Sequence, residues 1–177
     1  MTHPIRSYKD AVAFHGHACP GLALGYRAAQ YAMDSLQAGR SDDEELVCIV
    51  ENDACGIDAI QVVAGCSAGK GNLILRDFGK HAYTFIDRKH SRAIRLAQRP
   101  EPVVERIDPQ VAALRPKVMG GTATKQEAEE FHQRQAAVIE KILAMPVDEL
   151  FSIRETKPDI PEKARIVRGA AKIAIAG

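Results

Sequence analysis

Two histidines and a cysteine lie close together near the start of the chain. His15, His17 and Cys19 alternate with small residues and precede Pro20. If this segment is extended, alternate side chains point to the same side, so three potential metal ligands can converge. Cys19 falls at the expected start of a helix, where the helix dipole and free backbone N–H groups favour a thiolate. Thiolate is the form of cysteine that binds a metal ion.

Two further cysteines are candidates for the same site. Cys55 lies between an expected strand and an expected helix, and Cys66 follows in a glycine-rich loop. We expect a metal site held by His17, Cys19 and Cys55, with Cys66 or a water molecule completing it. His15 either contributes to the site, orients a ligand or caps the first helix. Imidazole with soft thiolates selects zinc or another transition metal, and three protein ligands leave one open position.

Two carboxylates flank Cys55. Asp53 and Asp58 are each expected either to act beside a metal, as ligand, hydrogen-bond partner of a ligand or general base, or to cap the helix that starts near Ile57. Cys48 lies inside an apolar strand and is expected to be a core residue.

The glycine-rich loop could hold an anion. Gly65 to Gly71 lacks the spacing of a Walker A loop, which also needs a Ser or Thr where Gly71 stands. Gly69, Lys70 and Gly71 nevertheless predict a backbone nest for a small anionic ligand beside the metal. The alternative is a plain turn into a strand. Three other histidines have no neighbouring ligand and are expected in surface or packing roles: His81, His90 and His132.

The elements that position these residues follow from periodicity, capping and breakers. A short helix begins after Ser7 and is cut short by Gly16, and a second runs from Pro20 to about Leu36. Leu46–Val50 predicts a buried central strand, and a helix from about Ile57 to Ala64 follows. Three strands are then expected as an antiparallel meander: Leu73–Arg76, His81–Asp87 and Ala93–Ala97.

The second half of the chain is predicted to be simpler. Prolines punctuate residues 100–123 and indicate an extended linker with one short helix around Gln110–Leu114. A long amphipathic helix is expected from Thr124 to about Ala144. Short extended pieces are expected at Leu150–Arg154 and Arg165–Arg168. The predicted fold class is α+β: a mixed sheet with a three-strand antiparallel meander, flanking helices and a long C-terminal helix.

Composition excludes several classes of partner. The 177 residues carry 24 Lys and Arg against 23 Asp and Glu, so a strongly basic field for nucleic acid is absent. No apolar run of about 18 residues could span a membrane. The N-terminal residues show no apolar signal segment, which predicts a cytoplasmic location. The four cysteines all fall in the first 66 residues, a pattern unlike that of a disulfide scaffold.

Three segments together resemble the FmdE family, which takes its name from formylmethanofuran dehydrogenase. They are residues 14–25, 53–59 and 65–73, which contain all the cysteines except Cys48. The resemblance implies an α+β core that forms a homodimer, and it makes residues 1–177 a single FmdE-like core domain. In this division 100–123 is the linker and 124–177 the C-terminal helix and arm. The chain has no cysteine after Cys66 and therefore lacks the C-terminal zinc finger of some members.

Three functions compete at this stage. The first is a metal-binding protein, with zinc as the expected cofactor, that is an enzyme or an accessory protein related to the molybdenum or tungsten formylmethanofuran dehydrogenase of one-carbon metabolism. The second is a sulfur carrier or redox protein that uses Cys19 or Cys55 as a reactive thiol. The third is a non-catalytic assembly protein whose metal, if present, stabilises the fold.

Overall fold

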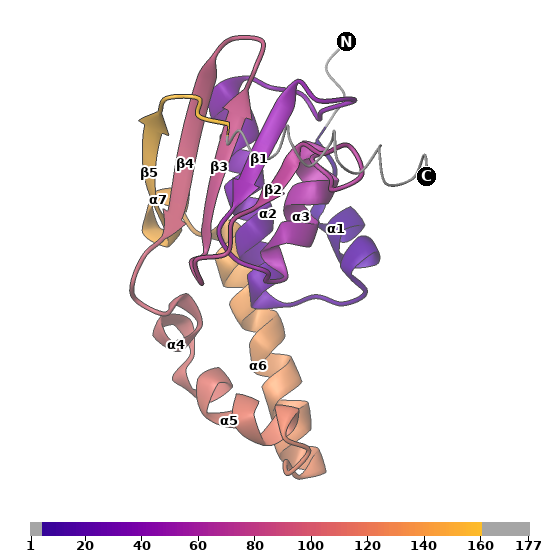
Figure 1. Ribbon diagram of the computed structural model, residues 1–177. Coiled ribbons are helices and arrows are strands. Elements are labelled where there is room, and N and C mark those ends of the chain that lie inside the picture. The colour runs from indigo at the N-terminus through magenta and orange to yellow at the C-terminus, as the bar shows by residue number, and fades with distance from the viewer. Residues whose placement is uncertain (1–4, 161–177) are drawn as a thin grey trace.

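The structure is a computed structural model of the chain and describes residues 5–160. It has an α+β fold, as predicted, in which helices pack on a mixed sheet (Figure 1). Within the described part of the chain, no helix has the length and apolar character needed to cross a membrane. The elements are α1 (Tyr8–His15), α2 (Pro20–Leu36), β1 (Leu46–Val50), α3 (Gly56–Ala64), β2 (Leu73–Leu75), β3 (Ala82–Asp87), β4 (Arg92–Gln98), α4 (Val103–Ile107), α5 (Pro109–Met119), α6 (Lys125–Ala144), α7 (Val147–Leu150) and β5 (Phe151–Thr156).

The sheet has the strand order β2-β1-β3-β4-β5. β1 pairs with β2 in parallel, and all other neighbours are antiparallel. The prediction that β2, β3 and β4 form the meander is therefore wrong for β2, and the three-strand antiparallel run is β3, β4 and β5. α3 is the reason, because a helical crossover between β1 and β2 returns the chain in the parallel direction.

β1 is buried along its whole length, as its apolar sequence predicts. Leu46, Cys48 and Val50 belong to the main core, which α2 and α3 cover. Val47 and Ile49 point the other way, into a second apolar cluster on the opposite face of the sheet. A strand with apolar partners on both faces needs a continuous apolar run rather than an alternating one.

The predicted helix starts before α1, α2 and α6 are confirmed. Ser7 and Asp10 form a reciprocal capping box at α1, and Thr124 and Glu127 form another at α6. At α2, Cys19 is the N-cap and Pro20 occupies the first helical position. α1 ends where the left-handed backbone of Gly16, with φ of 95°, turns the chain toward α2.

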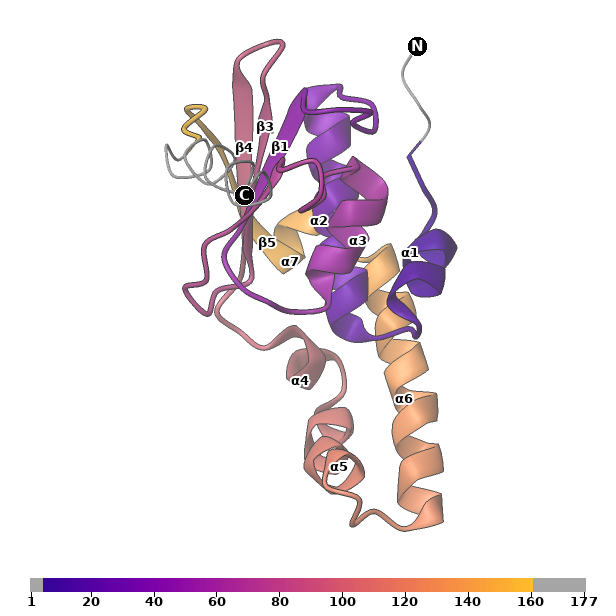
Figure 2. The ribbon, with the colours of Figure 1, turned by 45° about the vertical axis from the view of Figure 1, so that its right-hand side comes forward.

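Residues 100–123 differ from the predicted extended linker, because most of them are helical. Pro102 precedes α4, and Pro109 starts α5, so these prolines initiate helices instead of preventing them. α5 packs against α6, and with α4 they form an arm that extends from the body of the molecule (Figure 2). The expected extended piece near residue 150 becomes α7 followed by β5. The one at Arg165–Arg168 lies outside the described residues.

α2 and α3 pack with their backbones in contact. A Cβ atom on Gly25 would lie 2.2 Å from the carbonyl oxygen of Gly56, and one on Gly56 would lie 3.2 Å from the Cα of Gly25. Only glycine at both positions permits this approach. The contact sets the N-terminal part of α2 beside the first residue of α3, and so brings Cys19 and Cys55, which precede these helices, to one place.

We predict that Gly25→Ala destabilises the protein. Alanine raises helix propensity by about 1 kcal/mol, but the clash with a rigid backbone oxygen is expected to cost more, for a net loss of about 2 kcal/mol. Urea denaturation measures the difference. Gly69→Ala is the control, since a Cβ there meets no atom within 4 Å and should change stability by less than about 0.5 kcal/mol. Equal stability of the two variants would contradict the close contact.

Candidate metal centre

Three side chains from one short segment converge. His15 ends α1, His17 lies in the connecting loop, and Cys19 caps α2. One ligand atom from each, two ring nitrogens and a sulfur, all lie within 4.8 Å of one another. The two imidazole rings lie 4.6 Å apart between centroids. The structure thus brings together the three residues whose alternation in sequence indicated a metal site.

Asp58 holds His15 in a ligating orientation. The Nδ1 atom of His15 lies 2.6 Å from Oδ2 of Asp58, and because a carboxylate only accepts, Nδ1 is the donor. Nε2 is then left with its lone pair, and it lies 3.9 Å from Sγ of Cys19. A carboxylate that fixes the tautomer and direction of a histidine is the usual companion of a metal-binding imidazole. Asp58 therefore serves His15 and not the start of α3.

The distances suit a small transition-metal ion. Tetrahedral zinc with bonds of about 2.0–2.1 Å to nitrogen and about 2.3 Å to sulfur places neighbouring ligand atoms about 3.5 Å apart. The 3.9 Å between His15 and Cys19 needs only a small adjustment to reach that value. His17 is exposed and Cys19 half-buried, so an ion here would border solvent.

Cys19 differs electrostatically from the sequence-based expectation. Its Sγ does accept a hydrogen bond from the backbone N–H of Leu22, at 3.3 Å, as the N-cap position implies. Burial nevertheless raises the pKa of the thiol to about 11, and the nearby Cys55 also acts to raise it. Desolvation therefore outweighs the helix N-terminus, and without a metal Cys19 is a neutral thiol at neutral pH. A coordinated metal ion would deprotonate it.

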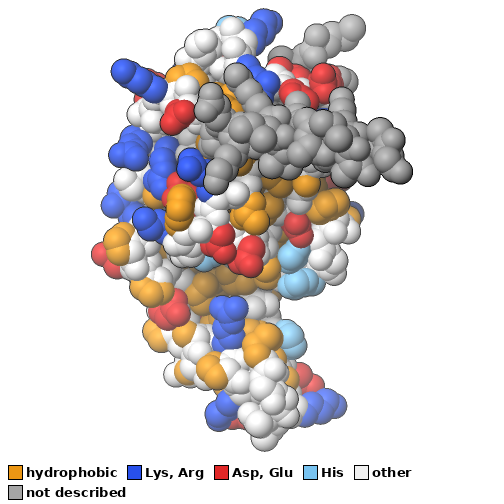
Figure 3. All heavy atoms as spheres, in the orientation of Figure 1, with side chains coloured by type: hydrophobic (Ala, Val, Ile, Leu, Met, Phe, Trp, Pro, Cys, Tyr) orange, Lys and Arg blue, Asp and Glu red, His pale blue; other side chains and the backbone are white. Residues whose placement is uncertain are grey.

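Cys55 lies next to this group at the edge of a pocket. It is half-buried and packs in the same small cluster as Cys19. The pocket has a volume of about 440 Å³ and is mainly apolar, and its ionisable side chains are those of His15, Asp53, Cys55 and Asp58. On this side of the molecule, histidine side chains lie close to acidic and hydrophobic ones (Figure 3). The pocket offers no lysine or arginine to an anion.

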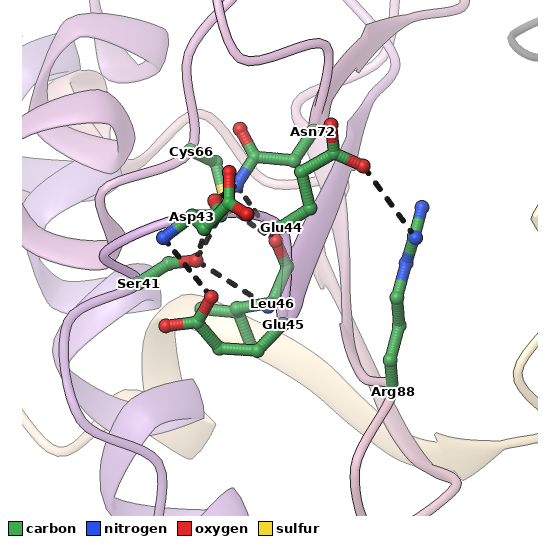
Figure 4. A network of polar contacts seen from close by, with 8 residues as sticks. All are labelled: Ser41, Asp43, Glu44, Glu45, Leu46, Cys66, Asn72 and Arg88. Atoms are coloured by element: carbon green, nitrogen blue, oxygen red, sulfur yellow. Dashed lines mark hydrogen bonds and ion pairs between the residues drawn. The ribbon is translucent and has the colours of Figure 1, made fainter.

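Cys66 lies apart from the His–Cys group, in contrast to its expected place in the site. It is fully buried, and its thiol donates to the carbonyl oxygen of Leu46 at 3.5 Å (Figure 4). Burial raises its pKa to about 12. The nine residues of α3 span about 13 Å and separate Cys66 from Cys55, which precedes the other end of that helix. Cys66 is a core residue beside Cys48.

The expected anion nest is closed by its own hydrogen bonds. Gly71 donates its backbone N–H to Ser67 and Ala68, and the backbone N–H of Lys70 donates to the Ser67 hydroxyl. The Lys70 ammonium donates to the carbonyl oxygens of Ser41, at 2.9 Å, and Asp42. Gly69 also belongs to this turn. The loop is therefore the plain turn of the alternative interpretation, and the structure does not place Lys70 beside the His–Cys group.

Tyr8 contributes to the site without any signal in the sequence. Its hydroxyl donates to the carbonyl oxygen of Cys19 at 3.5 Å, and its ring meets that of Tyr26 edge to face. Burial raises the pKa of Tyr8 to about 12, so the hydroxyl remains a donor. Tyr8 thus fixes the backbone at the N-cap of α2. Only the tertiary packing of α1 reveals this contact.

Comparison with known proteins gives a family match over most of the chain. Residues 14–152 match the family described as "FmdE, Molybdenum formylmethanofuran dehydrogenase operon". A curated relative from Archaeoglobus fulgidus, named a probable S-adenosyl-L-methionine-binding protein, is 40% identical over 97 residues. That match covers 52% of this chain but only 26% of the relative, so the chain spans about a quarter of its length.

A solved structure shares the fold. It is the crystal structure of an FmdE-like protein of tungsten formylmethanofuran dehydrogenase from Syntrophus aciditrophicus. The similarity covers 90% of this chain and 78% of the other, with a TM-score of 0.55 and 22% sequence identity. At this identity, the comparison supports the architecture alone.

The contact between Asp58 and His15 predicts the effect of removing the carboxylate. Asp58→Ala should weaken zinc binding by about 10- to 100-fold without changing the number of sites, because His15 loses its fixed tautomer and direction. Competition with a chelating dye measures the affinity. Asp53→Ala is the matched control, since Asp53 lines the same pocket but is not the carboxylate that holds His15. An equal loss of affinity in both variants would contradict the assigned role of Asp58.

Proposed function

Since the chain belongs to the FmdE family, we propose that it is a metal-binding protein related to formylmethanofuran dehydrogenase, with one zinc ion held by its His–Cys group. The observation that carries this proposal is the convergence of His15, His17 and Cys19, with His15 oriented by Asp58. Packing alone gives no reason for two histidines and a half-buried cysteine to meet in this way.

His15 and His17 would supply nitrogen ligands and Cys19 a thiolate. Cys55, which packs beside Cys19, or a water molecule would complete the shell. A zinc ion with an open position supplies a Lewis acid. The adjoining pocket, with Asp53 and Asp58 as its carboxylates, would favour a mainly apolar ligand over an anion at that position.

The reactive-thiol function is less well supported. A nucleophilic cysteine needs a lowered pKa, and burial raises that of Cys19 to about 11. Cys66 is buried in the core and out of reach of a substrate.

A non-catalytic assembly protein is the second candidate. The sequence predicts Lys70 as a cationic donor beside an open metal position, but its ammonium instead binds Ser41 and Asp42. This removes one argument for catalysis at the metal and favours an accessory role in one-carbon metabolism. A closed site, with Cys55 as fourth ligand, would fit that role. S-adenosylmethionine binding is not carried over, because most of the relative bearing that name lies outside the matched segment.

We further propose that the chain is a homodimer. The arm formed by α4, α5 and α6 extends from the body and exposes apolar side chains such as Met119, which is 67% exposed. In α6 the buried residues fall mostly in the second half of the helix, with Phe131 the first of them. A second copy that covers the arm would bury this surface.

The metal proposal is tested by loading the purified chain with zinc, removing unbound ion and measuring metal content. Wild type should retain one zinc per chain, and Cys19→Ser should lose it. Cys66→Ser is the control and should retain it, because its hydroxyl can still donate to Leu46 from outside the site. Circular dichroism reports whether each variant folds. A folded Cys19→Ser that keeps its full zinc content would contradict the proposal, as would loss of zinc in folded Cys66→Ser.

The dimer proposal is tested by analytical ultracentrifugation at micromolar concentration. A mass of twice the 19.3 kDa chain is expected, because obligate interfaces typically bury about 2,000 Å² or more and do not dissociate at such dilution. A monomer under these conditions would contradict the proposal.

A further inference from the structure

A second pocket lies at the other face of the sheet from α2 and α3. It has a volume of about 490 Å³ and is bounded by the start of β3, the end of β4 and the segment that leads to α4. Arg95, one of its lining residues, pairs in register with Thr84 of β3, which itself pairs with Ile49 of β1. Ile49 belongs to the apolar cluster opposite the main core, and this assigns the face.

The pocket is lined by basic groups and by no carboxylate. Lys80, Arg95 and Arg99 contribute to its wall together with His81. Arg95 is neutralised by Glu51, at 2.6 Å. Arg99 donates from Nε to a backbone carbonyl and keeps its charge uncompensated by that contact. Lys and Arg side chains gather on the side of the molecule where β4 and β5 lie (Figure 3).

Lys80 is the most informative of these groups. Within residues 5–160, its ammonium forms no ion pair and no side-chain hydrogen bond, although its backbone N–H binds the carbonyl oxygen of Glu51. That backbone contact fixes where the side chain starts. A positioned cation that lacks an internal partner is available to an external anion.

The cross-strand neighbour of Arg95 adds to the positive charge. Arg95 lies directly opposite Arg154 on β5. Like charges in directly opposed positions of antiparallel strands destabilise the pair. Glu51 compensates one of the two arginines, so an excess of positive charge remains on this part of the sheet. A bound anion would reduce that repulsion.

His81 has a defined role here, beyond the surface role that its isolation in sequence indicated. Its Nδ1 lies 2.8 Å from the side-chain nitrogen of Asn52, which can only donate. Nδ1 therefore accepts, and Nε2 carries the hydrogen. Partial burial lowers the pKa of His81, so at neutral pH it is a neutral N–H donor in the wall of the pocket.

We propose that this pocket binds the phosphate group of a small phosphorylated molecule. Two uncompensated cations and a fixed N–H donor match a phosphate, which accepts several charge-assisted hydrogen bonds. The volume of about 490 Å³ leaves room for an organic group beyond the phosphate. A nucleic-acid strand is disfavoured, because the chain carries a formal net charge of only +1. The site is separate from Lys70 and does not depend on the proposed metal.

Calorimetric titration of the full chain with inorganic phosphate and with pyrophosphate tests the proposal. One saturable site per chain is expected, weakening as sodium chloride screens the charges. Lys80→Met should lower affinity about tenfold, the usual effect of losing one charged hydrogen bond, and Lys80→Arg should restore most of it.

Two controls separate this site from other parts of the molecule. Lys89→Met removes a lysine beyond the far end of β3 and should leave the affinity unchanged. Cys19→Ser should also bind phosphate normally, which separates the pocket from the metal centre. The proposal is overturned if no saturable binding is seen, or if folded Lys80→Met binds as wild type does. It is also overturned if Lys89→Met loses as much affinity as Lys80→Met, since the binding would then be diffuse.

Discussion

The backbone contact between Gly25 and Gly56 is the constraint on which the candidate metal centre depends. It lets α2 and α3 lie closer than side chains on both helices would allow. Cys19 precedes the first helix and Cys55 the second, so the approach of the helices brings the two thiols together. α1 packs on α3 as well, which places His15 against Asp58. One small-residue contact in the core thereby sets the relative positions of the groups in the site.

Desolvation then decides the chemical state of those groups. The helix N-terminus favours a thiolate at Cys19, yet burial prevails and keeps the metal-free thiol protonated. A metal ion would reverse this, and its binding would release a proton. The two faces of the sheet differ in the same physical terms. The metal centre lies with the helices that cover the main core, whereas the basic pocket lies on the opposite face, where charges remain hydrated.

The sequence predicted local structure better than tertiary arrangement. Capping boxes at Ser7 and Thr124 and the apolar run of β1 are local signals, and the structure confirms the elements they indicated. The partner of β2 could not be read in this way, because strand order depends on where α3 crosses the sheet. The prolines mislead for a related reason: the same residue that ends one helix can start the next, as Pro109 does.

The candidate site divides along the same line. His15, His17 and Cys19 are neighbours in sequence, so their convergence could be predicted from spacing. The role of Asp58 depends on a contact across 43 residues, and that of Tyr8 on the packing of α1, so neither had a local signal. Residue type alone indicated Cys66 and Lys70, but a helix of nine residues carries both to the far end of α3.

X-ray absorption spectroscopy of the zinc-loaded chain tests the central claim most directly, because it reports the ligand atoms themselves. The account predicts a mixed shell with two nitrogen ligands at about 2.0–2.1 Å and one or two sulfur ligands at about 2.3 Å. Two sulfurs would indicate that Cys55 completes a closed site, and one would indicate an open position. A shell of four sulfurs, or one with no sulfur, would contradict a centre built on His15, His17 and Cys19.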